Sequence, residues 1–325
     1  MAQQKILKIV AHPSVRFDQV FYEHASTLSL MSGREFFTRR YAELGWNYED
    51  VRVSQAVRTN TMNADREEVV ERLEQRGIEL EKIAFLEDGY WVRKSRFSVG
   101  ATTEYLLGLY SIQEAAAQIP AELFTKLENK EVLDACAAPG GKTVQLANLM
   151  RNTGVIMALD VGEQRLRALG NQLERCRVQN SIVYKLDARK AMRLQQKFDR
   201  ILLDVPCSGN FAADKNWFHR RTLVDVERNA RVQRQMLEEA ANVLKDNGEI
   251  VYSTCSLEPE EDELNIDWAI KTLKLKTEDI ECCGQKALTN VFGRNLDSSV
   301  SKARRIWPDK TQGFFVAKLK RRDHA

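Results

Sequence analysis

The segment EVLDACAAPGGKTVQLANLMRN, residues 131–152, decides the fold class of this chain. Residues 131–138 are predicted to form a short apolar strand, and residues 142–152 have the apolar spacing of a helix. The turn between them is small and glycine-rich, so a ligand can approach the backbone closely. The start of the helix adds free N–H groups and the positive end of a dipole. The segment therefore predicts a strand–turn–helix unit that binds a carboxylate or a phosphate.

The chain after this segment repeats the alternation of strands and helices. Further strands are expected at 155–160, 181–187, 200–206, 249–255 and 313–320, with helices at 163–178, 226–248 and 259–273. This α/β alternation predicts a mostly parallel sheet with helices on both faces. In such a fold the site lies at the carboxyl ends of the strands. The residues at these predicted ends are Asp134, Cys136, Asp160, Asp187, Asp204, Cys207 and Cys255.

The first 107 residues follow a different pattern and are predicted to form separate units. Residues 1–50 have helical and mixed character. Residues 51–107 combine short strands with a helix over 66–77, which indicates a small α+β unit. The predicted division is therefore 1–50, 51–107 and 108–325, and the last of these parts holds the strand–helix alternation.

The composition is that of a globular protein, with 43% hydrophobic residues, 29% charged residues and a net charge of +3. The sequence contains no long apolar run and no signal-peptide pattern, so we expect neither a membrane span nor secretion. The six cysteines lack the spacing of zinc ligands. We therefore predict a cytoplasmic monomer with reduced thiols and no bound metal.

Two aspartates at the strand ends predict what the turn binds. Asp160 lies about 20 residues after the glycines, where an acidic residue takes ribose hydroxyls, and Asp187 could accept a hydrogen bond from an adenine amino group. Each could instead cap the segment that follows. A P-loop is the rival because GKT is present, but that loop needs a glycine where this chain has Cys136. A nucleoside pocket beside a carboxylate site suits S-adenosylmethionine.

Six stretches of the sequence resemble one known family, the Sun-type RNA (cytosine-5) methyltransferases. Three resemble its catalytic motifs in order and spacing: DACAAPGGKT (134–143), LDVPCSG (203–209) and YSTCSLEPEEDE (252–263). Three more resemble the segments around them: RTNT (58–61), GLYSIQEAAAQIPAELF (108–124) and RIWPDKTQGFF (305–315). The resemblance implies a Rossmann-like, S-adenosylmethionine-dependent methyltransferase domain that follows a small α+β RNA-recognition region.

The same resemblance implies a role for each residue at the strand ends. Asp160 would hold the ribose of S-adenosylmethionine, Asp187 its adenine side, and Asp204 would lie between cofactor and target base. Cys255 would be the nucleophile, and Cys207 would help to release the product. The turn that binds the rest of the cofactor would comprise Cys136, Ala137, Ala138, Pro139, Gly140, Gly141 and Lys142.

The two Cys-Ser dipeptides at positions 207 and 255 then have a chemical reason. Carbon 5 of cytosine is a poor nucleophile until a thiolate adds at carbon 6, after which carbon 5 can attack a sulfonium methyl group. One cysteine is expected to form the adduct and the other to help break it. For the remaining cysteines the alternative is a small buried hydrophobic residue.

A target base must leave its helix to reach such a site, so a basic surface is expected beside it. The candidate RNA contacts are Arg93, Lys94 and Arg96, and smaller basic clusters lie at 36–41 and 218–221. Ordinary solvated charge is the alternative for each cluster. The compact chain favours tRNA as the substrate, with rRNA as the close alternative. A non-catalytic RNA-binding assembly factor that keeps the fold is the other class of function.

Overall fold

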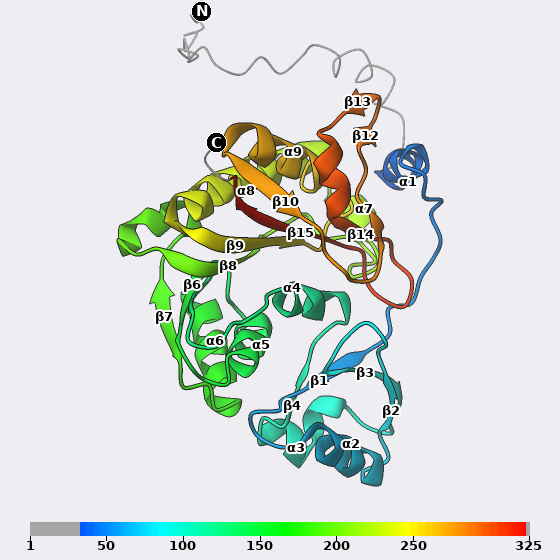
Figure 1. Cartoon of the computed structure of the whole chain (residues 1–325). Helices are drawn as coiled ribbons and strands as arrows, with labels where there is room; N and C mark the ends of the chain where they lie inside the picture. The colour runs from blue at the N-terminus through cyan, green and yellow to red at the C-terminus, as the bar shows by residue number, and fades with distance from the viewer. Residues whose placement is uncertain (1–32, 323–325) are drawn as a thin grey trace, which may run out of the picture.

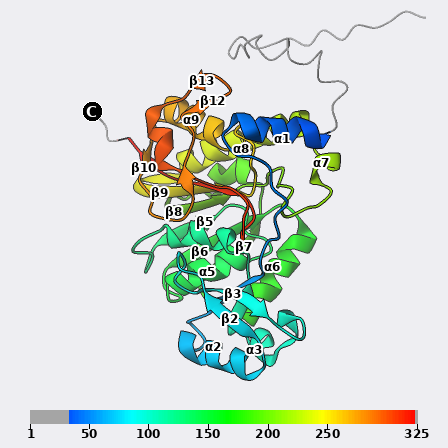
Figure 2. The same cartoon turned by 90° about the vertical axis from the view of Figure 1, so that its right-hand side faces the viewer.

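The computed structural model describes residues 33–322, and helix α1 (Gly33–Glu43) is its first element. The part of the predicted 1–50 segment that precedes residue 33 lies outside the described residues. Two β-sheets organise the rest of the chain, a large one in the middle of the molecule and a small one at one end (Figure 1, Figure 2).

The large sheet has nine strands in the order β11-β14-β15-β9-β8-β5-β6-β7, with β10 paired to β15. Strands β7, β6, β5, β8 and β9 are parallel, and β15 is antiparallel to β9. The bounds are β5 (Glu131–Asp134), β6 (Val155–Asp160), β7 (Ser181–Lys185), β8 (Phe198–Asp204), β9 (Leu244–Thr254), β10 (Leu275–Glu278), β11 (Gln285–Lys286), β14 (Arg304–Ile306) and β15 (Phe314–Arg321). The order reverses between β5 and β8, and ligands bind at such a point in open α/β sheets.

Helices cover both faces of the large sheet, as predicted (Figure 1). Along β8 the side chains alternate, so that Ile201 and Leu203 join the core under α8 and α9, while Leu202 joins the core with α4 and α5. The helices are α4 (Ile119–Glu122), α5 (Gly141–Leu149), α6 (Glu163–Arg175), α7 (Trp217–Arg220), α8 (Leu223–Val243) and α9 (Glu263–Thr272). Four 3₁₀ turns and a hairpin complete the described chain: η3 (Val99–Ala101), η4 (Ala116–Gln118), η5 (Ala188–Leu194), η6 (Ser298–Lys302), β12 (Asn290–Val291) and β13 (Arg294–Asn295).

Two predicted helix boundaries are wrong. The helix predicted at 259–273 begins at Glu263, because the carboxylates before it are buried and bind other segments of the chain. The helix predicted to end at Gly248 ends at Val243, because Leu244 already pairs with Phe198 in the sheet. In both places long-range contacts override the local sequence pattern.

The small sheet is antiparallel and has the order β2-β3-β1-β4. Its elements are β1 (Ala56–Thr59), α2 (Arg66–Gln75), β2 (Glu79–Lys82), β3 (Gly89–Lys94), α3 (Thr103–Leu106) and β4 (Tyr110–Ile112). Val57, Val69, Leu73 and Tyr110 form a separate core between this sheet and its helices. The predicted boundary between residues 107 and 108 therefore falls just before a strand of the small sheet.

The RTNT stretch joins the small sheet to the helices of the large one. Arg58 Nη2 donates a hydrogen bond to the Gly141 carbonyl at 3.2 Å, at the start of α5. Asn60 Nδ2 donates to the carbonyls of Gly108 (2.9 Å) and Cys176 (3.3 Å), where α6 ends. Both side chains are buried. This joint connects the small sheet to the helices that follow β5 and β6.

Substitution of Gly108 tests how tightly the joint is packed. Gly108 has a φ of +71°, and an added Cβ would lie 2.1 Å from the Arg175 carbonyl oxygen. Gly77 has a similar φ of +82° but open space around it. We expect Gly77→Ala to lower the free energy of unfolding by about 1–2 kcal/mol, from backbone strain alone. Gly108→Ala should lower it by roughly 1–3 kcal/mol more because of overpacking.

Urea denaturation of both variants measures the difference. Equal losses of unfolding free energy in Gly77→Ala and Gly108→Ala would show that the joint can rearrange around the added methyl group at no cost in stability.

Candidate active site

Cys207 and Cys255 lie side by side at the carboxyl edge of the large sheet. Cys207 follows β8 and Cys255 follows β9, and these strands are parallel neighbours in which Asp204 pairs with Ser253. The two sulfur atoms are 3.0 Å apart, and both side chains are half-buried. The contact with Cys255, and after it burial, raise the pKa of the Cys207 thiol well above its ordinary value. Cys207 therefore keeps its proton and can donate it toward Cys255.

Asp204 occupies the same edge and is held from two sides. Lys142 Nζ donates to one carboxylate oxygen at 2.7 Å, and Ser253 Oγ donates to the other at 2.7 Å. Burial alone would lower the pKa of Lys142, but Asp204 together with Asp134 raises it overall. Lys142 is thus a charged ammonium that connects the glycine turn to the edge carrying the cysteines.

The predicted cofactor turn is compact and lies at the carboxyl end of β5. Ala137 and Ala138 are buried, and Gly140, the residue before α5, has a φ of +111°, which favours glycine. Asp134 accepts a hydrogen bond from Thr143 Oγ1 at 2.7 Å, and burial raises the pKa of Asp134 to about 7. Burial also raises the pKa of Cys136, so this thiol stays neutral. Apart from the Lys142 ammonium, the turn presents backbone groups and small side chains rather than a reactive thiolate.

Asp160 and Asp187 are at their predicted strand ends, and each has protein partners. Asp160 accepts hydrogen bonds from Gly162 N (3.0 Å) and Arg165 Nε (3.1 Å), and Arg165 Nη2 also donates to the Ala138 carbonyl at 2.8 Å. The Asp187 carboxylate accepts a hydrogen bond from Arg189 N at 2.9 Å and so caps η5. This contact agrees with the alternative role of Asp187 as a cap. A ribose hydroxyl at Asp160 would share the carboxylate with Arg165.

The candidate RNA cluster on β3 is partly neutralised by its own sheet. Arg93 forms an ion pair with Glu81, and Lys94 forms one with Glu79 at 3.1 Å. All three cations are exposed, as is Phe97, whereas Trp91 of the same stretch is buried. The ion pairs favour the solvated-charge alternative for this cluster.

The other two basic clusters, 36–41 and 218–221, meet each other. Phe37 of α1 packs against Trp217 of α7 with ring centroids 4.6 Å apart. Arg40 of α1 is buried and turned inward, so it does not belong to an exposed basic surface. The aromatic residues thus pack between α1 and α7, while the cations Arg39, Arg220 and Arg221 remain exposed.

The acidic loop, residues 257–263, belongs to the YSTCSLEPEEDE motif, but its burial was not predicted from the sequence. Its carboxylates are all buried: Glu258, Glu260, Glu261, Asp262 and Glu263. Arg40 binds Glu260 at 2.8 Å and Glu258 at 3.2 Å. Burial raises the pKa of Glu258 to about 7. The cation that matches these acids comes from a helix more than two hundred positions away in the chain.

A second arginine neutralises the far end of the acidic loop. Arg305 of β14 is buried, donates to Glu263 Oε1 at 2.8 Å and to Asp262 at 3.2 Å, and binds the Leu257 carbonyl at 2.8 Å. Arg305 is the first residue of the RIWPDKTQGFF motif, so the family resemblance had already marked the segment that supplies this arginine. Arg40 had no comparable signal.

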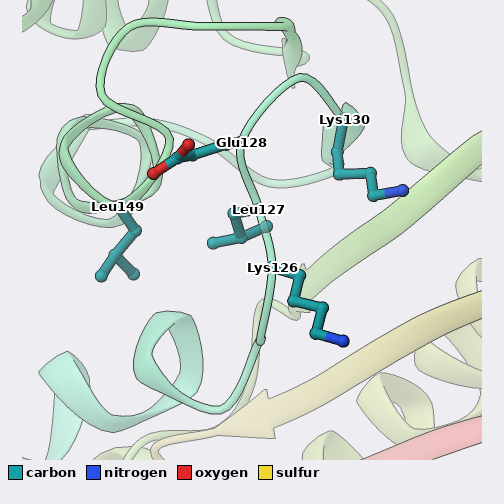
Figure 3. A pocket seen from close by; sticks show the side chains of 5 residues that line it. All are labelled: Lys126, Leu127, Glu128, Lys130 and Leu149. Atoms are coloured by element: carbon teal, nitrogen blue, oxygen red, sulfur yellow. The ribbon is translucent and has the colours of Figure 1, made fainter.

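Other features of the described residues lie away from this edge. A hollow of about 400 Å³ lies at the amino end of β5, lined by Lys126, Leu127, Glu128, Lys130 and Leu149 (Figure 3). Residues 33–322 contain no group of three His, Cys, Asp or Glu residues placed to hold a metal ion. Within the same residues, no helix is long and apolar enough to cross a membrane.

Comparison with known proteins links both parts of the chain to one family. Residues 121–320 match the family model of the 16S rRNA methyltransferase RsmB/F, and residues 33–115 match that of the N-terminal domain of 16S rRNA methyltransferase RsmF. A solved structure, the methyltransferase homolog protein from Pyrococcus horikoshii, is similar with a TM-score of 0.81 and 36% identity. The similarity covers 94% of this chain and 100% of that one. The predicted Rossmann-like fold with a small N-terminal unit is confirmed.

Two curated relatives differ in how much of their length this chain spans. The 28S rRNA (cytosine-C(5))-methyltransferase of Mus musculus is 35% identical over 82% of this chain, which spans 35% of that protein. The tRNA (cytosine(49)-C(5))-methyltransferase of Pyrococcus abyssi is 32% identical over 87% of this chain and 94% of its own length. The chain thus spans about a third of the mouse protein and nearly all of the archaeal one.

The acidic loop predicts a large effect for loss of Arg305. Arg305→Met leaves Asp262 and Glu263 buried without their cation, and we expect the free energy of unfolding to fall by about 3–5 kcal/mol. Arg167→Met removes an exposed ion pair with Glu163 and should change that energy by less than about 0.5 kcal/mol. Urea denaturation measures both values. Losses of similar size in the two variants would contradict the role given to Arg305.

Proposed function

This chain belongs to the RsmB/F family of methyltransferases, and we propose that it transfers a methyl group from S-adenosylmethionine to carbon 5 of a cytosine in RNA. One observation carries the proposal more than any other. Two thiols from different strands lie 3.0 Å apart, beside Asp204 and Lys142, at the edge where this fold places its site. A covalent reaction that needs one thiol to attack and another to assist release has both groups here.

The residues at the turn fit S-adenosylmethionine. Free N–H groups at the start of α5 suit its carboxylate, and Asp160 offers an acceptor for ribose hydroxyls next to the Ala138 carbonyl. Asp187 would lie on the adenine side. When bound there, S-adenosylmethionine would supply an electrophilic methyl group.

The chain's own residues then divide the reaction between them. The Cys255 thiolate forms a bond to carbon 6 of cytosine, which makes carbon 5 the nucleophile for the methyl group. After transfer, a base in the bound complex, such as water, takes the carbon 5 proton. The electrons of that C–H bond restore the double bond between carbons 5 and 6, and Cys255 leaves carbon 6 as a thiolate. Cys207, whose raised pKa keeps its proton in place, lies next to the sulfur that must leave. Asp204, held by Lys142 and Ser253, would bind the polar edge of the base and favour cytosine over uracil.

The RNA class that we propose is tRNA. The support is similarity, because a tRNA methyltransferase is 32% identical to this chain over 294 residues. The rRNA alternative has its own support, since both family models and the mouse relative carry rRNA names. The small unit with β1 to β4 would contact the RNA, with Arg93, Lys94 and Arg96 as the exposed cations of its predicted cluster.

Substitution of each cysteine tests the covalent mechanism. We expect Cys255→Ala to abolish both methyl transfer and any covalent link to RNA. Cys207→Ala should also lose turnover, but it should accumulate a protein–RNA adduct that survives denaturing electrophoresis, because attack continues while release fails. Cys282→Ala, in a half-buried cysteine outside the two Cys-Ser dipeptides, is the matched control and should behave as the unchanged protein.

Two outcomes would contradict these assignments. An adduct in Cys255→Ala but not in Cys207→Ala would exchange the two roles. Full activity in both variants would exclude the covalent mechanism.

Bisulfite sequencing of total RNA tests the substrate class. In cells that carry the gene, we expect a methylated cytosine in tRNA that is lost on deletion and restored by the intact gene, but not by the Cys255→Ala form. Loss of a mark in rRNA instead would favour the rRNA alternative. If no mark changes and the purified chain binds RNA but not S-adenosylmethionine, the chain is a non-catalytic RNA-binding factor.

A further inference from the structure

The two serines that follow the cysteines bind each other. Ser208 Oγ and Ser256 Oγ are 3.1 Å apart, and both residues are buried, at 1% and 0% exposure. The Cys-Ser dipeptides are therefore joined twice, through a contact between sulfurs and through a contact between hydroxyls. The serines are too deeply buried to meet a substrate, so any effect they have on chemistry must pass through the neighbouring cysteines.

Glu261 of the acidic loop ties this serine pair to the protein interior. Its carboxylate accepts hydrogen bonds from Ser208 N (2.9 Å) and Ser208 Oγ (2.5 Å). Gln233 of α8 donates to the same carboxylate at 3.1 Å and to the Pro206 carbonyl at 3.0 Å. The backbone on both sides of Cys207 is thus held by buried polar groups, and charge-assisted bonds of this kind are the strong ones.

The two cysteines depend on these contacts to different degrees. Cys255 directly follows the eleven-residue strand β9, and its carbonyl also accepts a hydrogen bond from Asn210 at 2.7 Å. Cys207 lies three residues beyond the end of β8, in a loop where Ser208 N donates to Glu261 at 2.9 Å. Trp217 Nε1 and Arg221 Nε also hold this loop, by donating to the Ser208 carbonyl at 2.8 and 3.0 Å. Loss of the serine contacts would therefore displace Cys207 more than Cys255.

We propose that Ser208, Ser256 and Glu261 form a positioning brace that sets the separation of the two sulfurs and thereby controls release of the methylated base rather than attack on it. This inference rests on the proposed function. Attack at carbon 6 needs Cys255 alone, whereas release needs Cys207 within reach of the departing sulfur. The brace residues are positioning residues, because none of them meets the reacting atoms.

The test measures adduct formation and release separately in the full chain. Ser208→Ala and Ser256→Ala should form the RNA adduct at close to the normal rate but release it roughly tenfold more slowly, the scale of one lost hydrogen bond to a charged group. Adduct should accumulate, as in Cys207→Ala. Ser301→Ala, which removes an exposed hydroxyl bonded to the Ser298 carbonyl, is the matched control.

The outcomes separate this inference from the function it rests on. If the unchanged chain neither methylates RNA nor forms an adduct, the proposed function fails. If it does both, and the serine variants slow attack and release equally or leave both unchanged, the brace is wrong while the function stands. Thermal unfolding of each variant accompanies the kinetics, because a purely structural role would lower stability without changing the ratio of the two rates.

Discussion

Burial of the acidic loop is the constraint on which the arrangement of this site depends. A charge removed from water costs several kcal/mol unless it is paired, and the loop buries five carboxyl groups within six positions. Arg40 and Arg305 bring helix α1 and strand β14 to the loop, and Ser208 brings the segment that follows β8. The need to satisfy these acids therefore gathers three distant segments around Cys255.

The small sheet is joined to the large one through a comparably costly group. Arg58 is fully buried, and burial without a carboxylate in hydrogen-bond contact lowers its pKa to about 10. Its bonds go to Gln113 and to the Gly141 carbonyl, at the first residue of α5. The unit proposed to contact RNA is thus bonded to the turn proposed to hold the cofactor.

Predictions from the sequence pattern were wrong where long-range contacts compete with the local preference for a structure. Residues 259–262 look like the start of a helix, with a proline and several good helix formers, yet their carboxylates bind Arg40, Ser208 and Arg305 instead. The basic cluster on β3 looked free, yet Glu79 and Glu81 of the adjacent strand pair with it. The pairing of Glu79 and Glu81 with the basic cluster cannot be predicted before the neighbouring strand is known, because charge pairs across a sheet depend on register.

The sequence by itself determined the α/β alternation, the glycine turn before α5, and the places of the cysteines and aspartates at strand ends, since each is a local property of a short segment. The tertiary structure decided which of those ends meet. Cys207 and Cys255 are 48 positions apart and come within 3.0 Å because β8 and β9 are adjacent. Arg40 and Glu258 are 218 positions apart and meet because two buried charges must be neutralised. Contacts of this range depend on topology and burial, which no short stretch of residues encodes.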